Sequence, residues 1–139
     1  GEESGGYAFR GHIPERDGIL SALFLLDMMV KTGKNPAELL TDLEDMVGSH
    51  FYNRMDIEFD EQERERILSR ISSNSPDTLS DIVISEIDTR DGYRFILEDG
   101  SWALLRFSGT EPLLRIYAES STTDMVESLI AECRNLVGV

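Results

Sequence analysis

Hydrophobic periodicity changes once along this chain of 139 residues, at Gly48. Before Gly48 the apolar residues recur with helical spacing, and after it most apolar runs alternate with polar residues, as in strands. Strands are expected at 51–59, 81–88, 93–98, 101–107 and 113–119, and helices are expected to open after Asp60 and at 122–124. The order β-α-β-β-β-β-α predicts an α+β domain in which an antiparallel sheet carries its helices on one face.

The residues before Gly48 have a different character. Only two positions of the segment 18–30 carry a polar side chain, and a helix that is apolar on nearly every side is normally buried on nearly every side. Asp17 can cap this segment at its start. A second helix is expected, with Asn35 as its cap, Glu38 completing a capping box and Gly48 just past its end. No expected strand accompanies these helices. We therefore expect residues 1–48 to be the helical C-terminal tail of an α/β domain, and residues 49–139 to form a separate domain.

The charge balance argues against two classes of partner. The chain has 27 acidic and 13 basic residues and a formal net charge of −14. Such a charge repels nucleic acids and anionic membranes, so neither is an expected partner. No apolar run reaches the about 18 residues of a membrane-spanning helix and no secretion signal is recognisable, so a cytoplasmic location is expected. The single cysteine, Cys133, lies in an apolar helical stripe and is expected to be a buried thiol.

The segment 106–115 gathers hydrogen-bond donors on a tight turn between two expected strands. A phosphate accepts several hydrogen bonds at once, arginine offers a planar fork that fits its oxygens, and successive amides form a concave nest. The segment is therefore a candidate site for a phosphate ester. Its candidate ligands are Arg106, Ser108, Gly109, Thr110 and Arg115. The alternative is an ordinary strand-to-strand turn, because Ser-Gly-Thr followed by Glu-Pro also has the composition of a turn.

The first six residues, Gly-Glu-Glu-Ser-Gly-Gly, form a second candidate segment. Two carboxylates and a hydroxyl on a glycine-rich loop suit the vicinal hydroxyls of a sugar. A flexible linker has the same composition, and both interpretations remain open.

Three motifs in this order resemble one enzyme family. They are the glycine-rich segment at 1–6, His-Ile-Pro-Glu-Arg-Asp-Gly at 12–18, and Arg-Phe-Ser-Gly-Thr-Glu-Pro at 106–112. Together they resemble the C-terminal third of an α-D-phosphohexomutase of the phosphoglucomutase/phosphomannomutase branch, and the resemblance covers the whole chain. It implies that residues 1–48 close the sugar-binding third domain. It also implies that residues 49–139 are the phosphate-binding fourth domain, similar in fold to the TATA-binding protein but without DNA binding.

The resemblance also implies an activity for the whole enzyme, the reversible interconversion of hexose 1-phosphate and hexose 6-phosphate through a hexose 1,6-bisphosphate. In that family a phosphoserine of the first domain donates the phosphoryl group, and Mg²⁺ held in the second domain assists. Neither the loop with the phosphorylated serine nor an aspartate-rich loop for the metal occurs in these residues. No catalytic residue, no metal ligand and no turnover are therefore expected from this chain alone. Its expected partners are hexose phosphates and the N-terminal domains of the same protein.

Carried over residue by residue, the resemblance assigns Glu2 and Ser4 to the sugar hydroxyls, and the five candidate ligands of the segment 106–115 to the non-reacting phosphate. Arg16 matches a basic position near the substrate in some relatives. His12 is a second possible site residue of the same segment. The alternatives are a surface charge for Arg16 and a structural role for His12. Glu111 is expected to orient an arginine or the loop, because a carboxylate repels a phosphate dianion.

Two other functions remain open from the sequence. One is a non-catalytic module that binds sugar phosphates, and the other is an oligomerisation domain that uses the apolar residues of 18–30. The identity of the sugar is open as well. The segment Glu-Glu-Ser-Gly-Gly resembles family members that act on glucose or mannose phosphates more than those that act on amino-sugar phosphates.

Overall fold

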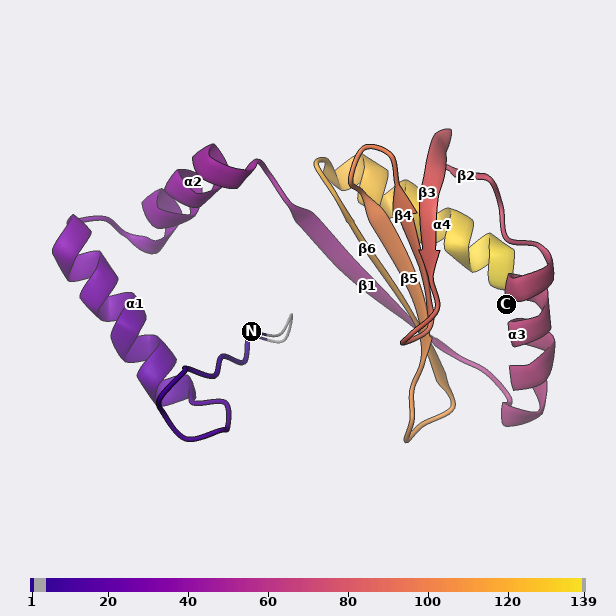
Figure 1. The fold of residues 1–139 in the computed structure, drawn as a ribbon, viewed down its shortest axis with the longest axis horizontal. Helices are drawn as coiled ribbons and strands as arrows, with labels where there is room; N and C mark the ends of the chain where they lie inside the picture. The colour runs from indigo at the N-terminus through magenta and orange to yellow at the C-terminus, as the bar shows by residue number, and fades with distance from the viewer. Residues whose placement is uncertain (2–4, 139) are drawn as a thin grey trace. The chain divides into compact units, whose positions relative to one another are not determined.

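A computed structural model describes residues 1 and 5–138, and the chain divides into two compact units, Gly1–Val47 and Gly48–Val139 (Figure 1). Among the described residues, none of the helices has the length and hydrophobicity that crossing a bilayer requires.

The first unit contains two helices, α1 (Gly18–Thr32) and α2 (Pro36–Val47), which begin where the sequence predicts. The Asp17 carboxylate caps α1 by accepting a hydrogen bond from an amide of its first turn at 2.9 Å. Asn35 Oδ1 accepts bonds from the first amides of α2, and Glu38 Oε2 accepts a bond from Asn35 N at 2.8 Å. These reciprocal bonds close the predicted capping box, so the local sequence determines where both helices start.

The apolar first helix is exposed in this unit, where no strand was expected to accompany it. No residue of α1 is buried, and Ile19 and Val30 are 79% and 83% exposed. An apolar helix can be buried only against another layer, and the described part of this unit contains no strand. The helix also runs two residues past its predicted end, to Thr32, where Gly33 provides a left-handed cap with a φ of 71°.

The second unit is a six-stranded antiparallel sheet with two helices on one face, so the predicted α+β class is confirmed (Figure 1). Its strands are β1 (Phe51–Glu58), β2 (Thr78–Leu79), β3 (Ile82–Asp88), β4 (Tyr93–Leu97), β5 (Trp102–Phe107) and β6 (Leu113–Ser120), in the sheet order β1-β6-β5-β4-β3-β2. Its helices are α3 (Arg64–Ser73), which follows the 3₁₀ turn η1 (Glu61–Glu63), and α4 (Thr123–Val137).

The hydrophobic core lies between the sheet and these two helices. Phe95 of β4, Ile67 of α3 and Leu129 of α4 are fully buried members of it. Cys133 is buried as well, in agreement with the prediction, and this burial raises the pKa of its thiol to about 12. The core therefore anchors α3 and α4 against the same strands that lead into the candidate loop.

Strand alternation determines which side chains reach the uncovered face of the sheet. Leu105 of β5 and Leu114 of β6 are buried in the core, so their neighbours Arg106 and Arg115 belong to the opposite face. The two arginines of the candidate site are therefore presented on the side of the sheet that carries no helix.

The short strand β2 was not predicted. It has two residues, and its turn into β3 passes through Ser80 and Asp81, whose φ angles of 50° and 63° are uncommon for non-glycine residues. The Glu132 carboxylate of α4 accepts a hydrogen bond from Ser80 N at 2.9 Å. Because this support comes from a distant helix, no local pattern in the sequence indicates the strand.

Candidate functional site

The loop Ser108–Pro112 joins β5 to β6 and is closed at its base. Ser108 N donates a hydrogen bond to Leu113 O at 2.8 Å, and Ser108 is only 6% exposed. The next two residues, Gly109 and Thr110, are exposed. The base of the loop is thus held by the sheet while its tip is open to solvent.

The amides at the tip of the loop are available to a ligand. Among the residues that the structure describes, the Gly109 N–H makes no hydrogen bond, and the Thr110 N–H makes only a long one, of 3.4 Å, to Ser108 Oγ. The hydroxyl oxygens of Ser108 and Thr110 lie 3.5 Å apart. Two weakly engaged amides and two hydroxyls lie together, an arrangement that an anion can use.

Arg106 and Arg115 face each other directly in the pairing of β5 with β6. Two like charges in such a cross-strand pair repel, and a shared anion or nearby carboxylates must offset the repulsion. Arg115 lies 3.9 Å from the Asp56 carboxylate and 3.8 Å from the Glu111 carboxylate, too far for hydrogen bonds. Its Nε is buried without a hydrogen-bond partner in the described part of the chain. The Arg115 guanidinium therefore lies near two carboxylates but makes no hydrogen bond to either of them.

The Glu111 carboxylate lies on the Arg115 side of the loop, 3.8 Å from Arg115 Nη2. Arg106 has a carboxylate neighbour too, because its Nη1 lies 3.3 Å from Asp91 Oδ2. Arg106 thus has a close acidic neighbour from a turn, whereas the carboxylates near Arg115 lie at longer distances.

A cavity of about 320 Å³ opens beside the same loop. Its lining residues are Glu61, Arg64, Ser108, Gly109, Thr110, Glu111 and Pro112. Arg64 was not identified from the sequence, since it belongs to the first turn of α3 and lies far from the loop in the chain. Only the packing of α3 against the sheet brings its guanidinium beside the loop.

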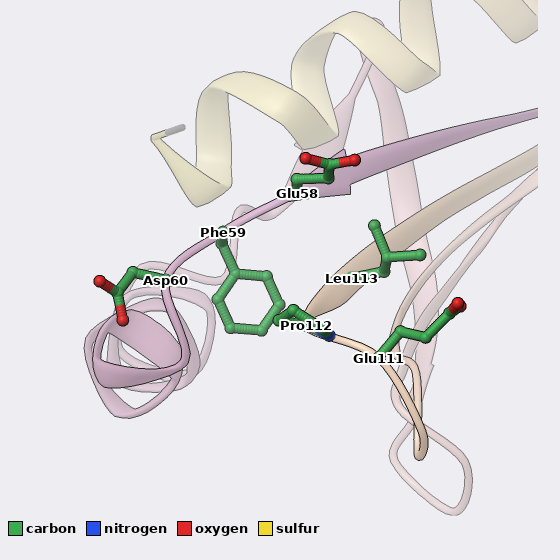
Figure 2. Close-up of a pocket in the computed structure, with 6 residues that line it drawn as sticks. All are labelled: Glu58, Phe59, Asp60, Glu111, Pro112 and Leu113. Atoms are coloured by element: carbon green, nitrogen blue, oxygen red, sulfur yellow. The ribbon is translucent and has the colours of Figure 1, made fainter.

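A larger cavity, of about 460 Å³, lies between the end of β1 and the beginning of β6 (Figure 2). Figure 2 shows Phe59 beside Pro112, with the carboxylates of Glu58, Asp60 and Glu111 around them. Three carboxylates disfavour a phosphate here. Nor does any group of histidine, cysteine, aspartate or glutamate side chains in the described residues suit a metal ion. The smaller cavity is the better candidate for an anion.

The candidate residues of the first unit lie at its glycine-rich beginning and just before α1. Glu2 and Ser4 lie outside the described residues. His12 Nε2 lies 2.8 Å from Asp17 Oδ2, the carboxylate that caps α1, so the structure places His12 at the start of this helix. The helix amide of Leu20 and the His12 ring both lower the pKa of Asp17. Arg16 Nε lies 3.6 Å from Glu15 Oε1 on an exposed turn.

Comparison with known families gives matches over both units. The family model described as the phosphoglucomutase/phosphomannomutase C-terminal domain matches residues 54–136. The model described as the phosphoglucomutase/phosphomannomutase alpha/beta/alpha domain III matches residues 1–46.

Individual relatives give the same result. The chain is 32% identical over 124 residues to a phosphoglucomutase/phosphomannomutase of Thermococcus kodakarensis, covering 89% of this chain and 25% of the relative. It is 35% identical to a probable phosphoglucosamine mutase of Methanothermobacter thermautotrophicus, covering 89% of this chain and 26% of the relative. It is 33% identical to a phosphoglucosamine mutase of Leuconostoc mesenteroides, covering 99% of this chain and 26% of the relative. The chain thus spans about a quarter of the length of these proteins.

Proposed function

Because this chain belongs to the phosphoglucomutase/phosphomannomutase family, we propose that it is the C-terminal, substrate-holding part of a phosphohexose mutase. In this proposal the second unit binds the phosphate of a hexose phosphate that does not react. The first unit supplies contacts to the sugar hydroxyls through Glu2 and Ser4. The whole enzyme moves a phosphoryl group between two carbons of the sugar.

The observation that carries the proposal is the facing pair Arg106 and Arg115 next to the open amides of Gly109 and Thr110. A phosphate dianion bound there removes the repulsion between the two guanidinium groups and accepts hydrogen bonds from the loop. Charge-assisted bonds of this kind contribute roughly 1.5–3 kcal/mol each. A few of them suffice for binding in the micromolar range, at about −8 kcal/mol.

A site built in this way binds the phosphate whichever carbon of the sugar carries it. Backbone amides, hydroxyls and guanidinium groups all recognise the phosphate oxygens. The bisphosphate intermediate of a mutase must present first one phosphate and then the other to the reacting centre. We call the proposed site of Arg106, Ser108, Gly109, Thr110 and Arg115 the phosphate seat. A seat that accepts either phosphate equally, with separate contacts to the sugar, meets that requirement. Positioning and electrostatic stabilisation are most of what phosphoryl transfer demands of a protein.

The groups that perform the chemistry belong to other parts of the longer enzyme in this proposal. Mg²⁺ stabilises the charge of the transferred phosphoryl group in such reactions. The described residues contain no group suited to a metal, so none of them is assigned as its ligand. Arg16 is retained as a residue near the substrate. His12 is assigned to the helix cap, because its contact is with Asp17. The chain alone is expected to show no turnover.

The substrate is proposed to be a hexose phosphate, with the sugar still to be decided. Relatives at similar identity are named for glucose and mannose phosphates and for glucosamine phosphate. The phosphate seat cannot discriminate among these sugars, because it contacts only the group they share. The discrimination is assigned to the segment that contains Glu2 and Ser4.

Phosphate binding by the chain is tested by titrating the ¹⁵N-labelled chain with inorganic phosphate. The amide resonances of Gly109 and Thr110 are expected to shift together and to saturate. Equal ionic strength from sodium chloride is the control, because it changes screening without offering a phosphate. If these amides do not move, or if the shifts are spread over unrelated surface residues, the proposed phosphate seat is wrong.

The second test uses the complete enzyme and the 1-phosphates of glucose, mannose and glucosamine. Arg115→Ala should lower kcat/KM for all three sugars by a similar factor, whereas Glu2→Ala should change the ratios among them. A change of sugar preference in Arg115→Ala would contradict the division of roles.

A further inference from the structure

Arg64 lies against the residue that leads into the phosphate loop. Its Cζ is 4.7 Å from the centre of the Phe107 ring and 5.6 Å from that of Phe59. The two rings pack edge to face, with centres 5.3 Å apart. Phe107 stands between Arg106 and Ser108 in the chain, so a cation that holds its ring also holds the beginning of the loop.

The guanidinium of Arg64 is itself held in place. Its Nε and Nη2 donate to the two carboxylate oxygens of Glu61, one helical turn earlier. These bonds raise the pKa of Arg64, so the group stays charged at any ordinary pH. Its side chain is 30% exposed, on the wall of the 320 Å³ cavity that the loop also lines. Arg64 is therefore a fixed guanidinium, paired with Glu61, on the wall of the cavity that Gly109 and Thr110 also line.

We propose that Arg64 is a positioning residue of the phosphate seat, a role that rests on the proposed function. Its stacking on Phe107 keeps the loop in the form that presents the Gly109 and Thr110 amides. Its charge balances that of Glu61, a carboxylate of the same cavity wall that would otherwise repel an anion. The pair Arg106 and Arg115 contacts the phosphate from the uncovered face of the sheet, while Arg64 supports the loop from the side of α3.

The same helix offers a matched control. Arg66 pairs with Glu63 at the same three-residue spacing at which Arg64 pairs with Glu61. Among the described residues, however, only Arg64 of these two stacks on an aromatic ring. Replacing either arginine removes one positive charge and one ion pair from α3, but only Arg64 touches the start of the loop.

The experiment compares Arg64→Gln, Arg64→Lys and Arg66→Gln in the 139-residue chain. Two readouts are used: the dissociation constant for inorganic phosphate, and ¹⁵N relaxation of Gly109 and Thr110 without phosphate. Arg64→Gln is expected to weaken phosphate binding by about three- to tenfold and to lower the loop order parameters. Arg64→Lys should restore part of the affinity, because it keeps the charge but loses the planar stacking. Arg66→Gln should change affinity by less than about twofold.

The outcomes separate this proposal from the proposed function. Equal affinities for Arg64→Gln and Arg66→Gln, with unchanged loop order, would overturn the role of Arg64 while leaving the phosphate seat intact. If the unmodified chain does not bind phosphate, the proposed function fails. In that case the role in phosphate binding fails with it, and loop relaxation in Arg64→Gln and Arg66→Gln decides only whether Arg64 orders the loop.

Discussion

The Asp91 carboxylate lies 3.3 Å from the Arg106 guanidinium, so the turn between β3 and β4 reaches an arginine of the proposed phosphate seat. The next residue, Gly92, has a φ of 114° and packs against the backbone of β5. A Cβ at this position would stand 2.4 Å from Leu105 O and 3.3 Å from Arg106 Cα. The turn is therefore fitted to the strand that carries Arg106.

Gly92→Ala is expected to destabilise the second unit by more than about 2 kcal/mol, because backbone atoms must move and the φ is strained. Gly100→Ala is the matched control. Gly100 also has a positive φ, 87°, but its added Cβ would meet no atom within 4 Å, so only the left-handed conformation costs energy, about 1 kcal/mol. Urea unfolding of both variants measures the difference. Equal losses would show that the contact with β5 is unimportant.

Arg115→Ala should separate binding from stability. The two facing arginines repel each other, and Arg115 makes no short ion pair, so its removal should change the free energy of unfolding by less than about 0.5 kcal/mol. Phosphate binding should weaken by about tenfold or more, because a charge-assisted donor is lost.

The check for Arg115→Ala is the rise in melting temperature that added phosphate produces, which depends on affinity through mass action. The rise should be clearly smaller in Arg115→Ala than in the unmodified chain. Arg90→Ala is a suitable control, because it removes the same charge from a side chain that is 88% exposed. The same rise in Arg115→Ala and in Arg90→Ala would argue against a specific role for Arg115.

The parts of the site that could be predicted from the sequence are those that lie together in the chain. Arg106, Ser108 and Arg115 belong to one strand-loop-strand segment, so their spacing alone predicts that they meet. Arg64 and Asp91 could not be found in this way, because one comes from a helix and the other from a different hairpin. Their positions depend on how the sheet orders its strands, which no local pattern encodes.

The fold shows the same division between local and distant information. The caps at Asp17 and Asn35 are local and were predicted correctly. The strand Thr78–Leu79 depends on Glu132 of a distant helix and was missed. The exposure of α1 agrees with the expectation that no strand accompanies it, because an apolar pattern shows that a helix needs burial but not that a sheet is present to cover it.

Cys133 makes stability fall at high pH. Its thiol has a pKa of about 12 in the folded chain against an ordinary value of 9.0, because burial disfavours the thiolate. Above pH 9 the unfolded state loses this proton while the folded state keeps it. The free energy of unfolding therefore decreases as pH rises, by up to about 1.4 kcal/mol per pH unit from this group.

Urea unfolding at pH 8, 9 and 10 of the unmodified chain and of Cys133→Val measures this contribution. The fall of stability with pH should be shallower in the variant. The buried thiol should also react with a thiol reagent such as dithionitrobenzoate only on unfolding. Fast labelling of the folded chain, or parallel pH profiles for the two proteins, would contradict the assignment.

Residues 48–139 are expected to fold without the first unit. Every residue of the hydrophobic core lies in this part of the chain, from Ile67 to Val137. A piece comprising 48–139 should therefore unfold cooperatively in urea, with a free energy within about 0.5 kcal/mol of that of the same unit in the whole chain. It should also bind inorganic phosphate with unchanged affinity, because all five proposed ligands of the phosphate are retained.

The complementary piece, 1–47, should show no cooperative transition, since none of its helix residues is buried. Circular dichroism during urea titration follows both pieces. A loss of more than about 1 kcal/mol in 48–139 would mean that the first unit stabilises the second, because so large a change requires a lost buried contact. Unchanged stability with weakened phosphate binding would instead place a phosphate contact within residues 1–47.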